Sequence, residues 1–227
     1  MSITVVLIRH AESGKNIKKS FSSPEMDNSE ILTVNGINQA TSIGDSIQLY
    51  CNKKNIKKIS VYSAKSLRSM QTAEIISKKL NCQVHAIDGV QSFNFGTNAG
   101  KKEIDVMNEQ CEFYHRLTLY RKGIINSYDI VYEGSKETLK EYERHVYENI
   151  NNHIAKAENN SLSLFVIHRS ALTAYLLFLA RKHFNYPKDF YGYIQLDLGN
   201  VCIFEIEDEK VKHFDINIST KEFEKLL

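Results

Sequence analysis

The chain has no tryptophan, only two prolines and only four cysteines among its 227 residues. The four cysteines lie far apart, at Cys51, Cys82, Cys111 and Cys202. Because no C-x-x-C pair occurs, the sequence indicates neither a zinc knuckle nor a redox dithiol. Cysteines scattered in this way are typical of buried thiols in a reducing compartment.

Excess charge and long apolar runs are also missing. Lys and Arg number 29 against 27 Asp and Glu, and this balance argues against a general nucleic-acid binder. No apolar run of roughly 18 residues predicts a membrane span, and the N-terminus lacks the basic and apolar regions of a secretory signal. We therefore expect a cytoplasmic protein with neither a nucleic-acid nor a membrane partner.

Linkers, repeats and low-complexity blocks are absent as well, which predicts a single domain over residues 1–227. Short β-branched runs alternate with segments of helical periodicity, a pattern typical of α/β proteins. The predicted strands are Ile3–Ile8, Ile56–Tyr62, Cys82–Ile87 and Ser161–Ile167, followed by antiparallel edge strands at Tyr193–Leu198, Cys202–Ile206 and Val211–Ile216. The predicted helices are Thr33–Lys53, Ser66–Leu80, Lys101–Arg121, Ser135–Ala157 and Ser170–His183, with an irregular loop at Asp88–Gly100.

Basic side chains follow several of these strands. Arg9 and His10 come directly after the first apolar strand, and His168 follows a second strand of similar composition. Arg68 lies at the start of the helix that follows a third strand. Taken singly, each is more often a structural or solvated residue. If the strands are parallel, however, these side chains meet above the carboxyl edge of the sheet, where α/β proteins bind ligands.

This set of residues suits a phosphoryl group. A guanidinium presents a planar fork of donors that matches phosphate oxygens. A neutral imidazole can attack phosphorus and carry the group as a phosphohistidine. Phosphoryl transfer mainly requires positioning and neutralisation of charge, which two arginines and a second histidine can provide without a metal or another cofactor.

Five ordered segments resemble one known family, the histidine phosphatase superfamily, which includes the cofactor-dependent phosphoglycerate mutases and fructose-2,6-bisphosphatase. The segments are RHAESGKN from Arg9, LTVNGINQA from Leu32, SAKSLRSMQTAEII from Ser63, GSKETLKEYERHV from Gly134 and LDLGNVCIFEI from Leu196. The first is similar to the family's R-H-G-E-x-x-x-N signature, with Ala11 in place of glycine. The resemblance implies an α/β fold, a three-layer α/β/α sandwich with a mostly parallel central sheet and an antiparallel edge.

The resemblance also implies roles for single residues. His10 is the expected nucleophile, and Arg9, Arg68 and His168 are expected to form the phosphate pocket. Four further residues are candidate substrate contacts, namely Asn16, Ser13, Arg169 and Ser92.

Two positions depart from the family pattern. The family places a glutamate that protonates the leaving group a few residues before a Phe-Gly pair, and Ser92 stands there in this chain. Acid catalysis typically contributes about 10²–10⁴-fold, so its loss predicts a slow enzyme or one limited to good leaving groups. The carboxylates that could substitute are Glu12, Asp88, Glu133 and Glu137, although for each of them taken singly the favoured interpretation is a surface or capping residue. The second departure is Arg169, where the family has a small residue; it could bind a more anionic substrate or pair with an acidic side chain.

The favoured hypothesis is a metal-independent phosphatase that hydrolyses a small phosphorylated metabolite through a phosphohistidine on His10. A phosphoglycerate-type mutase ranks lower, because Lys101–Glu133 does not match the lid that a mutase needs. A phosphate-binding pseudoenzyme that has lost its acid stays open, and a phosphoprotein phosphatase is a weaker third idea. Neither the natural substrate nor an oligomeric state is indicated.

Overall fold

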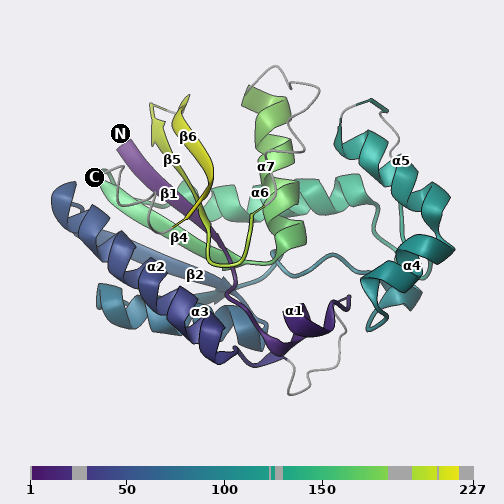
Figure 1. Cartoon of the computed structure of the whole chain (residues 1–227). Helices are drawn as coiled ribbons and strands as arrows, with labels where there is room; N and C mark the ends of the chain where they lie inside the picture. The colour runs from purple at the N-terminus through teal and green to yellow at the C-terminus, as the bar shows by residue number, and fades with distance from the viewer. Residues whose placement is uncertain are drawn as a thin grey trace.

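The computed structural model describes residues 2–21, 30–122, 124–125, 130–183, 196–208 and 210–219. Six strands of these ranges form one sheet in the order β3-β2-β4-β1-β5-β6 (Figure 1). The strands are β1 (Ser2–Arg9), β2 (Lys58–Ala64), β3 (Val84–Ile87), β4 (Ser161–Ile167), β5 (Val201–Glu207) and β6 (Lys210–Ile218). The helices are α1 (Gly14–Lys18), α2 (Val34–Lys53), α3 (Leu67–Leu80), α4 (Glu103–Glu109), α5 (Cys111–Arg121), α6 (Leu139–Ile154) and α7 (Arg169–His183), with a 3₁₀ turn η2 (Gly96–Asn98).

The sheet is parallel where the predicted site residues follow it. Strand β4 pairs in parallel with both β1 and β2, and the register of β1 and β4 ends on the pair Arg9 and Ile167. The amide of His10 donates to the carbonyl of Ile167 (3.0 Å). The two strands therefore end at the same level, so that His10 and His168 emerge side by side. Strands β5 and β6 supply the antiparallel edge.

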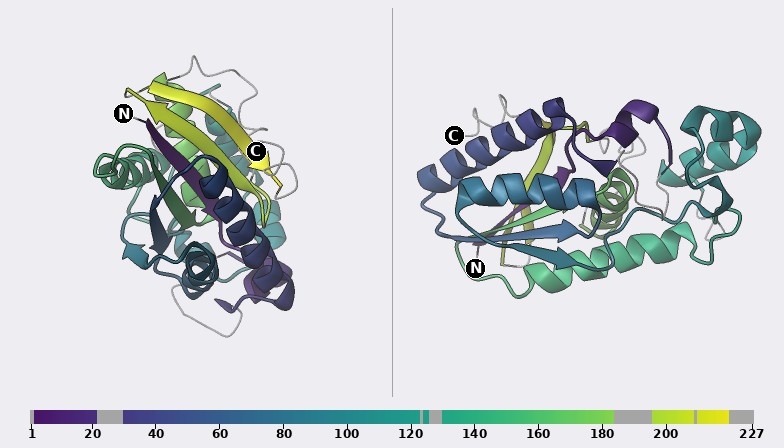
Figure 2. Two further views of the ribbon diagram at one scale, coloured as in Figure 1. Left: turned by 90° about the vertical axis from the view of Figure 1, so that its left-hand side faces the viewer. Right: turned by 90° about the horizontal axis from the view of Figure 1, so that it is seen from below.

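Helices cover both faces of this sheet, as the mostly parallel pairing requires. Alternate residues of β1 serve different layers: Val5 and Leu7 pack with α6 and α7, whereas Val6 and Ile8 pack with α2 and α3. Figures 1 and 2 show the layers, with α1, α4 and α5 beyond the carboxyl ends of the parallel strands. The predicted three-layer sandwich with an antiparallel edge is confirmed.

Local sequence explains where two of the longer helices begin. The hydroxyl of Thr33 accepts from the amide of Gly36 (3.0 Å) and caps α2, at the residue where the predicted helix Thr33–Lys53 begins. Thr138 and Glu141 form a reciprocal capping box at the start of α6. Because of this cap, α6 begins a few residues later than the predicted helix Ser135–Ala157.

Three expectations require correction. The predicted helix Lys101–Arg121 is two helices, α4 and α5, which break at Gln110. Helix α1 is absent from the helices that the sequence predicts. Of the predicted strand Tyr193–Leu198, residues 193–195 lie outside the described ranges, and residues 196–198 are not part of a strand. None of the helices described combines the length and the apolarity that crossing a membrane requires.

Candidate active site

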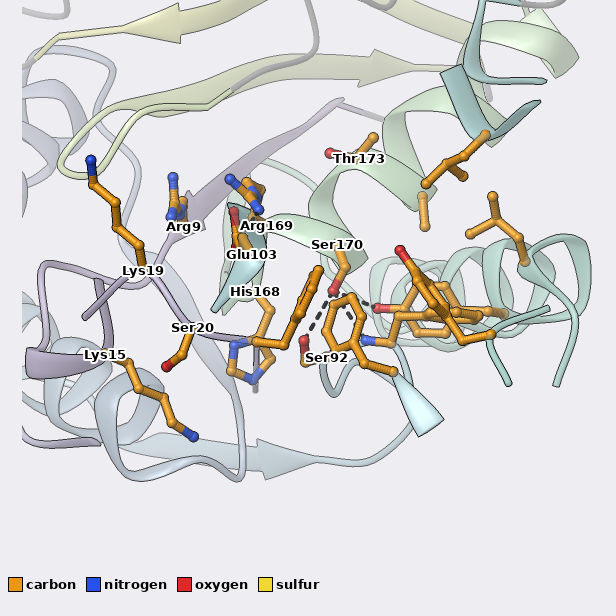
Figure 3. Close-up of a pocket in the computed structure, with 18 of the residues that line it drawn as sticks. Arg9, Lys15, Lys19, Ser20, Ser92, Glu103, His168, Arg169, Ser170 and Thr173 are labelled. Carbon is orange, nitrogen blue, oxygen red and sulfur yellow. Dashed lines mark hydrogen bonds and ion pairs between the residues drawn. The ribbon is translucent and has the colours of Figure 1, made fainter. Parts of the chain in front are cut away.

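A cavity of about 570 Å³ opens at the carboxyl ends of β1 and β4 (Figure 3). One end is strongly cationic, and its lining includes Arg9, His10, Lys15, Arg68, His168 and Arg169. The other part is largely aromatic, with Phe21, Phe93, Phe95, Tyr114, Tyr132 and Tyr142 among its walls. The structure thus brings together all four predicted catalytic residues, which come from three separate strand-to-helix junctions.

The ring of His10 is held in one tautomer. Its Nδ1 lies 2.9 Å from the carbonyl oxygen of Ala11. Since a carbonyl can only accept, Nδ1 carries the proton. The other ring nitrogen, Nε2, accepts a hydrogen bond from Nε of Arg68 (3.1 Å). His10 therefore presents an unprotonated Nε2, the form that a nucleophile needs.

The same guanidinium fixes the second histidine. Nη2 of Arg68 donates to Nδ1 of His168 (3.1 Å), so the ring proton of His168 resides on Nε2. The two imidazole centroids are 5.4 Å apart in an edge-to-face arrangement. One arginine thus orients both a proton-free nitrogen on His10 and a donor nitrogen on His168.

Burial and positive charge keep both imidazoles neutral. The pKa of His10 lies well below 6.5, first because burial disfavours the imidazolium and then because Arg68 repels it. The pKa of His168 is lowered well below 6.5 for the same two reasons, in the same order. Neutral imidazole is therefore the resting state of both residues at physiological pH.

A buried glutamate holds Arg68 in place. Glu30 is only 3% exposed, and its carboxylate pairs with Nη1 of Arg68 and with Nζ of Lys15. The Lys15 side chain is itself buried. Burial lowers the pKa of Arg68, and the carboxylate of Glu30 opposes that shift. The two cations and the carboxylate form a buried network around the expected phosphate position.

Arg9 occupies a different side of the cationic end. Its Nη1 donates to the carbonyl oxygen of Leu196 (3.3 Å). Burial first, and then the charge of Arg169, lower its pKa to about 10, so the side chain stays cationic at neutral pH. Two guanidinium groups thus lie close together there, as Figure 3 shows.

The remaining predicted contacts fall in different places. Asn16 lines the cavity, and its Oδ1 accepts from the amide (2.9 Å) and hydroxyl (3.0 Å) of Ser13. Ser13 is fully buried and is not part of the cavity wall. The structure therefore does not support a direct substrate contact by Ser13, because its hydroxyl donates to Oδ1 of Asn16 and so orients the Asn16 amide group.

Ser92, which stands in the expected place of the acid, does line the cavity. Its hydroxyl lies 3.3 Å from that of Ser170, which also accepts from the amide of Phe93 (3.1 Å) and the hydroxyl of Tyr142 (3.2 Å). Figure 3 shows this hydroxyl cluster beside His168. It contains no carboxyl group, so it offers polar contacts but no carboxylic acid.

None of the four carboxylates considered as substitutes lines the cavity. Glu12 accepts from the hydroxyl of Thr33 (2.7 Å), and Glu137 pairs with His145. Asp88 is held at the surface by Lys65, whose hydrogen bond lowers the pKa of Asp88. The backbone carbonyl of Glu133 accepts from Thr97, and the rest of this residue is exposed.

Arg169 pairs with an acidic side chain, one of the two alternatives for this position. Its Nη2 donates to Oε1 of Glu103 (2.9 Å), and both residues line the cavity. Sequence reasoning missed Glu103, Lys15 and Glu30. No motif marks Glu103 or Glu30, whereas Lys15 stands inside the first recognised segment at a position where the family pattern specifies no residue type.

Metal ligands do not gather around this site. Within the described ranges no three His, Cys, Asp or Glu side chains group closely enough to hold a metal ion.

Several known proteins to which this chain is similar are described as phosphatases. A family model described as histidine phosphatase superfamily (branch 1) matches residues 5–218. A probable phosphatase of Schizosaccharomyces pombe is 34% identical over 97 residues, a stretch that spans 43% of this chain and only 32% of that protein.

Solved structures share the fold over nearly the full length. A putative alpha-ribazole-5'-P phosphatase from Escherichia coli superposes with a TM-score of 0.72 at 19% identity, covering 96% of this chain and 97% of the other. A mutant phosphoserine phosphatase from Entamoeba histolytica, in complex with phosphoserine, also gives a TM-score of 0.72 at 21% identity, covering 97% and 98%.

Proposed function

Because the chain belongs to the histidine phosphatase superfamily, we propose that it is a metal-independent phosphatase whose nucleophile is His10. Its substrate would be a small phosphorylated metabolite, hydrolysed through a phosphohistidine with no cofactor. The observation that carries this proposal is the fixed tautomer of His10, whose Nε2 is unprotonated and which lines the cavity together with four cationic side chains, Arg9, Lys15, Arg68 and Arg169.

In the first step the lone pair of Nε2 attacks phosphorus, the N–P bond forms and the bond from phosphorus to the ester oxygen breaks. Arg68 releases its hydrogen bond to Nε2 and donates to a phosphate oxygen instead. Arg9 and Nε2–H of His168 donate to the other oxygens. These donors stabilise the charge on the transferring group. Meanwhile Nδ1 of His10 keeps its proton and donates it in the hydrogen bond to the carbonyl oxygen of Ala11.

In the second step water attacks the phosphohistidine. The N–P bond breaks, Nε2 recovers its lone pair and inorganic phosphate leaves. Splitting one displacement into two allows each to proceed in line within the same set of donors. Asn16, whose carbonyl oxygen is occupied by Ser13, can turn its amide hydrogens toward the phosphate.

Cavity size supports a substrate larger than inorganic phosphate alone. A volume of about 570 Å³ exceeds what one phosphate needs, so the organic part of the ester would lie against the aromatic walls. The related solved structures carry names that refer to alpha-ribazole phosphate and phosphoserine. Those names belong to the two related proteins, and they support a small phosphate ester as the substrate proposed for this chain.

One observation favours a second candidate, a phosphate-binding pseudoenzyme. The hydroxyl cluster of Ser92 and Ser170 holds no carboxylic acid where the family has its proton donor. Such a protein would bind phosphate through Arg9 and Arg68 without turning it over. Turnover separates the two candidates directly.

The test is hydrolysis of p-nitrophenyl phosphate in the presence of EDTA. We expect activity in the wild type, a loss of at least about 10³-fold in His10→Ala, and no change in the control His115→Ala, whose side chain is exposed on α5. When the reaction with a substrate labelled in its phosphoryl group is stopped rapidly without acid, the labelled phosphoryl group should be found on the wild-type protein and not on His10→Ala. Undiminished hydrolysis by His10→Ala would overturn the proposal, and phosphate binding without turnover of any monoester would favour the pseudoenzyme.

A further inference from the structure

The proton that the leaving group needs must come from a group in the cavity or from solvent. Among the described residues that line the cavity, only Glu103 and Glu143 carry a carboxyl group. A carboxylic acid is the donor best matched to an alkoxide leaving group near neutral pH. The choice therefore lies between these two glutamates.

Glu143 is held at the wrong end. It is 1% exposed, and its Oε2 accepts from Nη1 of Arg181 (2.7 Å) and the hydroxyl of Tyr120 (3.1 Å). Arg181 lies twelve residues beyond Arg169 on α7, which is about 18 Å along the helix axis. Glu143 is thus buried and anchored to Arg181, near the other end of α7 from His168.

Glu103 lies at the cationic end, and the backbone fixes it there. Its amide donates to the carbonyl of Lys19 (3.0 Å), and the amide of Phe21 donates to the carbonyl of Lys101 (2.9 Å). Ser20 and Lys102 form a β-bridge between these two contacts. This short ladder ties the start of α4 to the segment that follows α1, which in turn follows the loop of His10.

The side chain of Glu103 faces the phosphate pocket. It contacts Arg169, the residue directly after His168, and its charge acts on Arg9. Figure 3 shows Glu103 grouped with Arg9 and Arg169 at one side of the cavity, above His168. About a third of the side chain is exposed (34%), so the carboxyl group can exchange protons with water between turnovers.

We propose that Glu103 is the proton donor to the leaving group, in the place of the acid that the sequence lacks at Ser92. The inference rests on the proposed function. As the bond between phosphorus and the ester oxygen breaks, the carboxyl proton passes to that oxygen, and an alcohol leaves instead of an alkoxide. In the second step the resulting carboxylate takes a proton from the attacking water, which restores the acid.

The ion pair with Arg169 holds the carboxyl group of Glu103 in position. Nη2 of Arg169 donates to Oε1 of Glu103 (2.9 Å), and Arg9 lies at the same side of the cavity (Figure 3). A bound phosphate attracts both guanidinium groups to itself, which releases the carboxyl group of Glu103 to approach the departing ester oxygen.

The experiment compares esters that differ in leaving group. Phenyl and alkyl phosphates need protonation of the departing oxygen, whereas 4-nitrophenolate leaves without it. For Glu103→Gln we expect kcat/KM, which reports the first step, to fall by about 10²-fold or more on alkyl phosphates and by less than about threefold on p-nitrophenyl phosphate. In contrast, kcat should fall on both because the second step loses its base. Rates across a series of esters should also depend more steeply on the leaving-group pKa, and Glu103→Asp should recover part of the loss.

Two controls accompany this series. Glu109→Gln removes an exposed carboxylate from the other end of the same helix α4, and kcat/KM should stay unchanged on both kinds of ester. Inhibition by inorganic phosphate should stay within about threefold in Glu103→Gln, which shows that the pocket is intact.

Each other outcome has a separate meaning. Equal loss of kcat/KM on alkyl and aryl esters, or no loss on either, would overturn the role of Glu103 while leaving a His10-dependent phosphatase. A faster enzyme on both substrates would also overturn it and would mean that the ion pair only obstructs the entrance. Hydrolysis that does not depend on His10 would overturn the proposed function itself.

Discussion

At the scale of single residues, Arg68 connects most of the groups on which the proposed chemistry depends. Its three nitrogens contact His10, His168 and Glu30. The contacts with His10 and His168 set the tautomers of the two imidazoles. The contact with Glu30 holds the guanidinium in the position that makes those two contacts possible. Glu30 is therefore a positioning residue, since it acts on the reacting atoms only through Arg68.

Replacing Glu30 by glutamine should leave two buried cations, Lys15 and Arg68, without their shared carboxylate. Breaking such a buried pair costs about 3 kcal/mol, so we expect Glu30→Gln to lower the free energy of unfolding by roughly that amount in phosphate-free buffer. Millimolar phosphate should raise the Tm of Glu30→Gln more than that of the wild type, because the anion compensates the same charges. Thermal unfolding with and without phosphate measures both effects.

The control is Glu158→Gln, which removes an exposed partner of Lys58 and should change stability by less than about 0.5 kcal/mol. An unchanged Tm for Glu30→Gln would show that the buried network does not hold Arg68.

The sequence made some of these residues predictable and not others. His10 and His168 directly follow apolar strands, and Arg9 and Arg68 stand inside segments that resemble the family, so their convergence could be expected. Glu30 and Glu103 lie outside any motif, and only the packing of loops against the strand ends brings them to the site.

At the scale of secondary-structure elements, the start of α2 determines where the loop after β1 can lie. A Cβ placed on Gly36 would meet the carbonyl oxygen of Glu12 at 2.0 Å. The same carbonyl accepts from the amide of Thr33 (3.0 Å). Helix α2 can approach the segment next to His10 this closely only because position 36 has no side chain.

We expect Gly36→Ala to destabilise the protein by about 2–3 kcal/mol, because either α2 or the backbone of Glu12 must move. Hydrolysis of p-nitrophenyl phosphate should slow as well, since Glu12 is two residues from His10. Urea unfolding and the rate of hydrolysis are the measurements.

Gly44→Ala on the same helix is the matched variant. Its Cβ would meet Cγ (2.9 Å) and Cβ (3.1 Å) of Lys79 and no backbone atom closer than 3.4 Å, and alanine favours the helix by about 1 kcal/mol. Gly44→Ala should therefore destabilise the protein less than Gly36→Ala does. Equal destabilisation by both substitutions would mean that contact with Glu12 is not what matters at position 36.

Elements with strong periodicity were predictable to within a few residues. The capped helix α2 and the buried strands β1 and β4 are examples, since their patterns leave few alternatives. The two helices in the segment 101–121 were not predictable, because no proline or glycine marks the break at Gln110, whose side chain exchanges hydrogen bonds with that of Asn98. Helix α1 is too short for periodicity to reveal it.

At the scale of the whole molecule, the two buried histidines make folding sensitive to acid. Both pKa values lie well below 6.5 in the folded chain, first because of burial and then because of Arg68, whereas an unfolded histidine titrates near 6.5. Below that pH the unfolded chain binds protons that the folded chain does not. Stability is therefore fully present above about pH 6.5 and is lost as the pH falls further.

We expect the free energy of unfolding to decrease by up to about 1.4 kcal/mol per pH unit for each of these histidines between pH 6.5 and 5. His10→Asn should reduce the slope of the free energy of unfolding against pH by the contribution of one histidine. His115→Asn, a substitution at an exposed position on α5, should leave that slope unchanged. Urea unfolding across this pH range tests the slope, and an identical slope in His10→Asn and the wild type would contradict the prediction.

The guanidinium shared by His10 and His168 has a further consequence for anyone who observes this protein by magnetic resonance. Because Arg68 contacts Nε2 of one ring and Nδ1 of the other, a displacement of that one side chain alters the surroundings of both. Their ring-nitrogen signals should therefore shift together when an anion binds, even an anion that touches only one of them. A spectroscopist would see two reporters that never give independent readings.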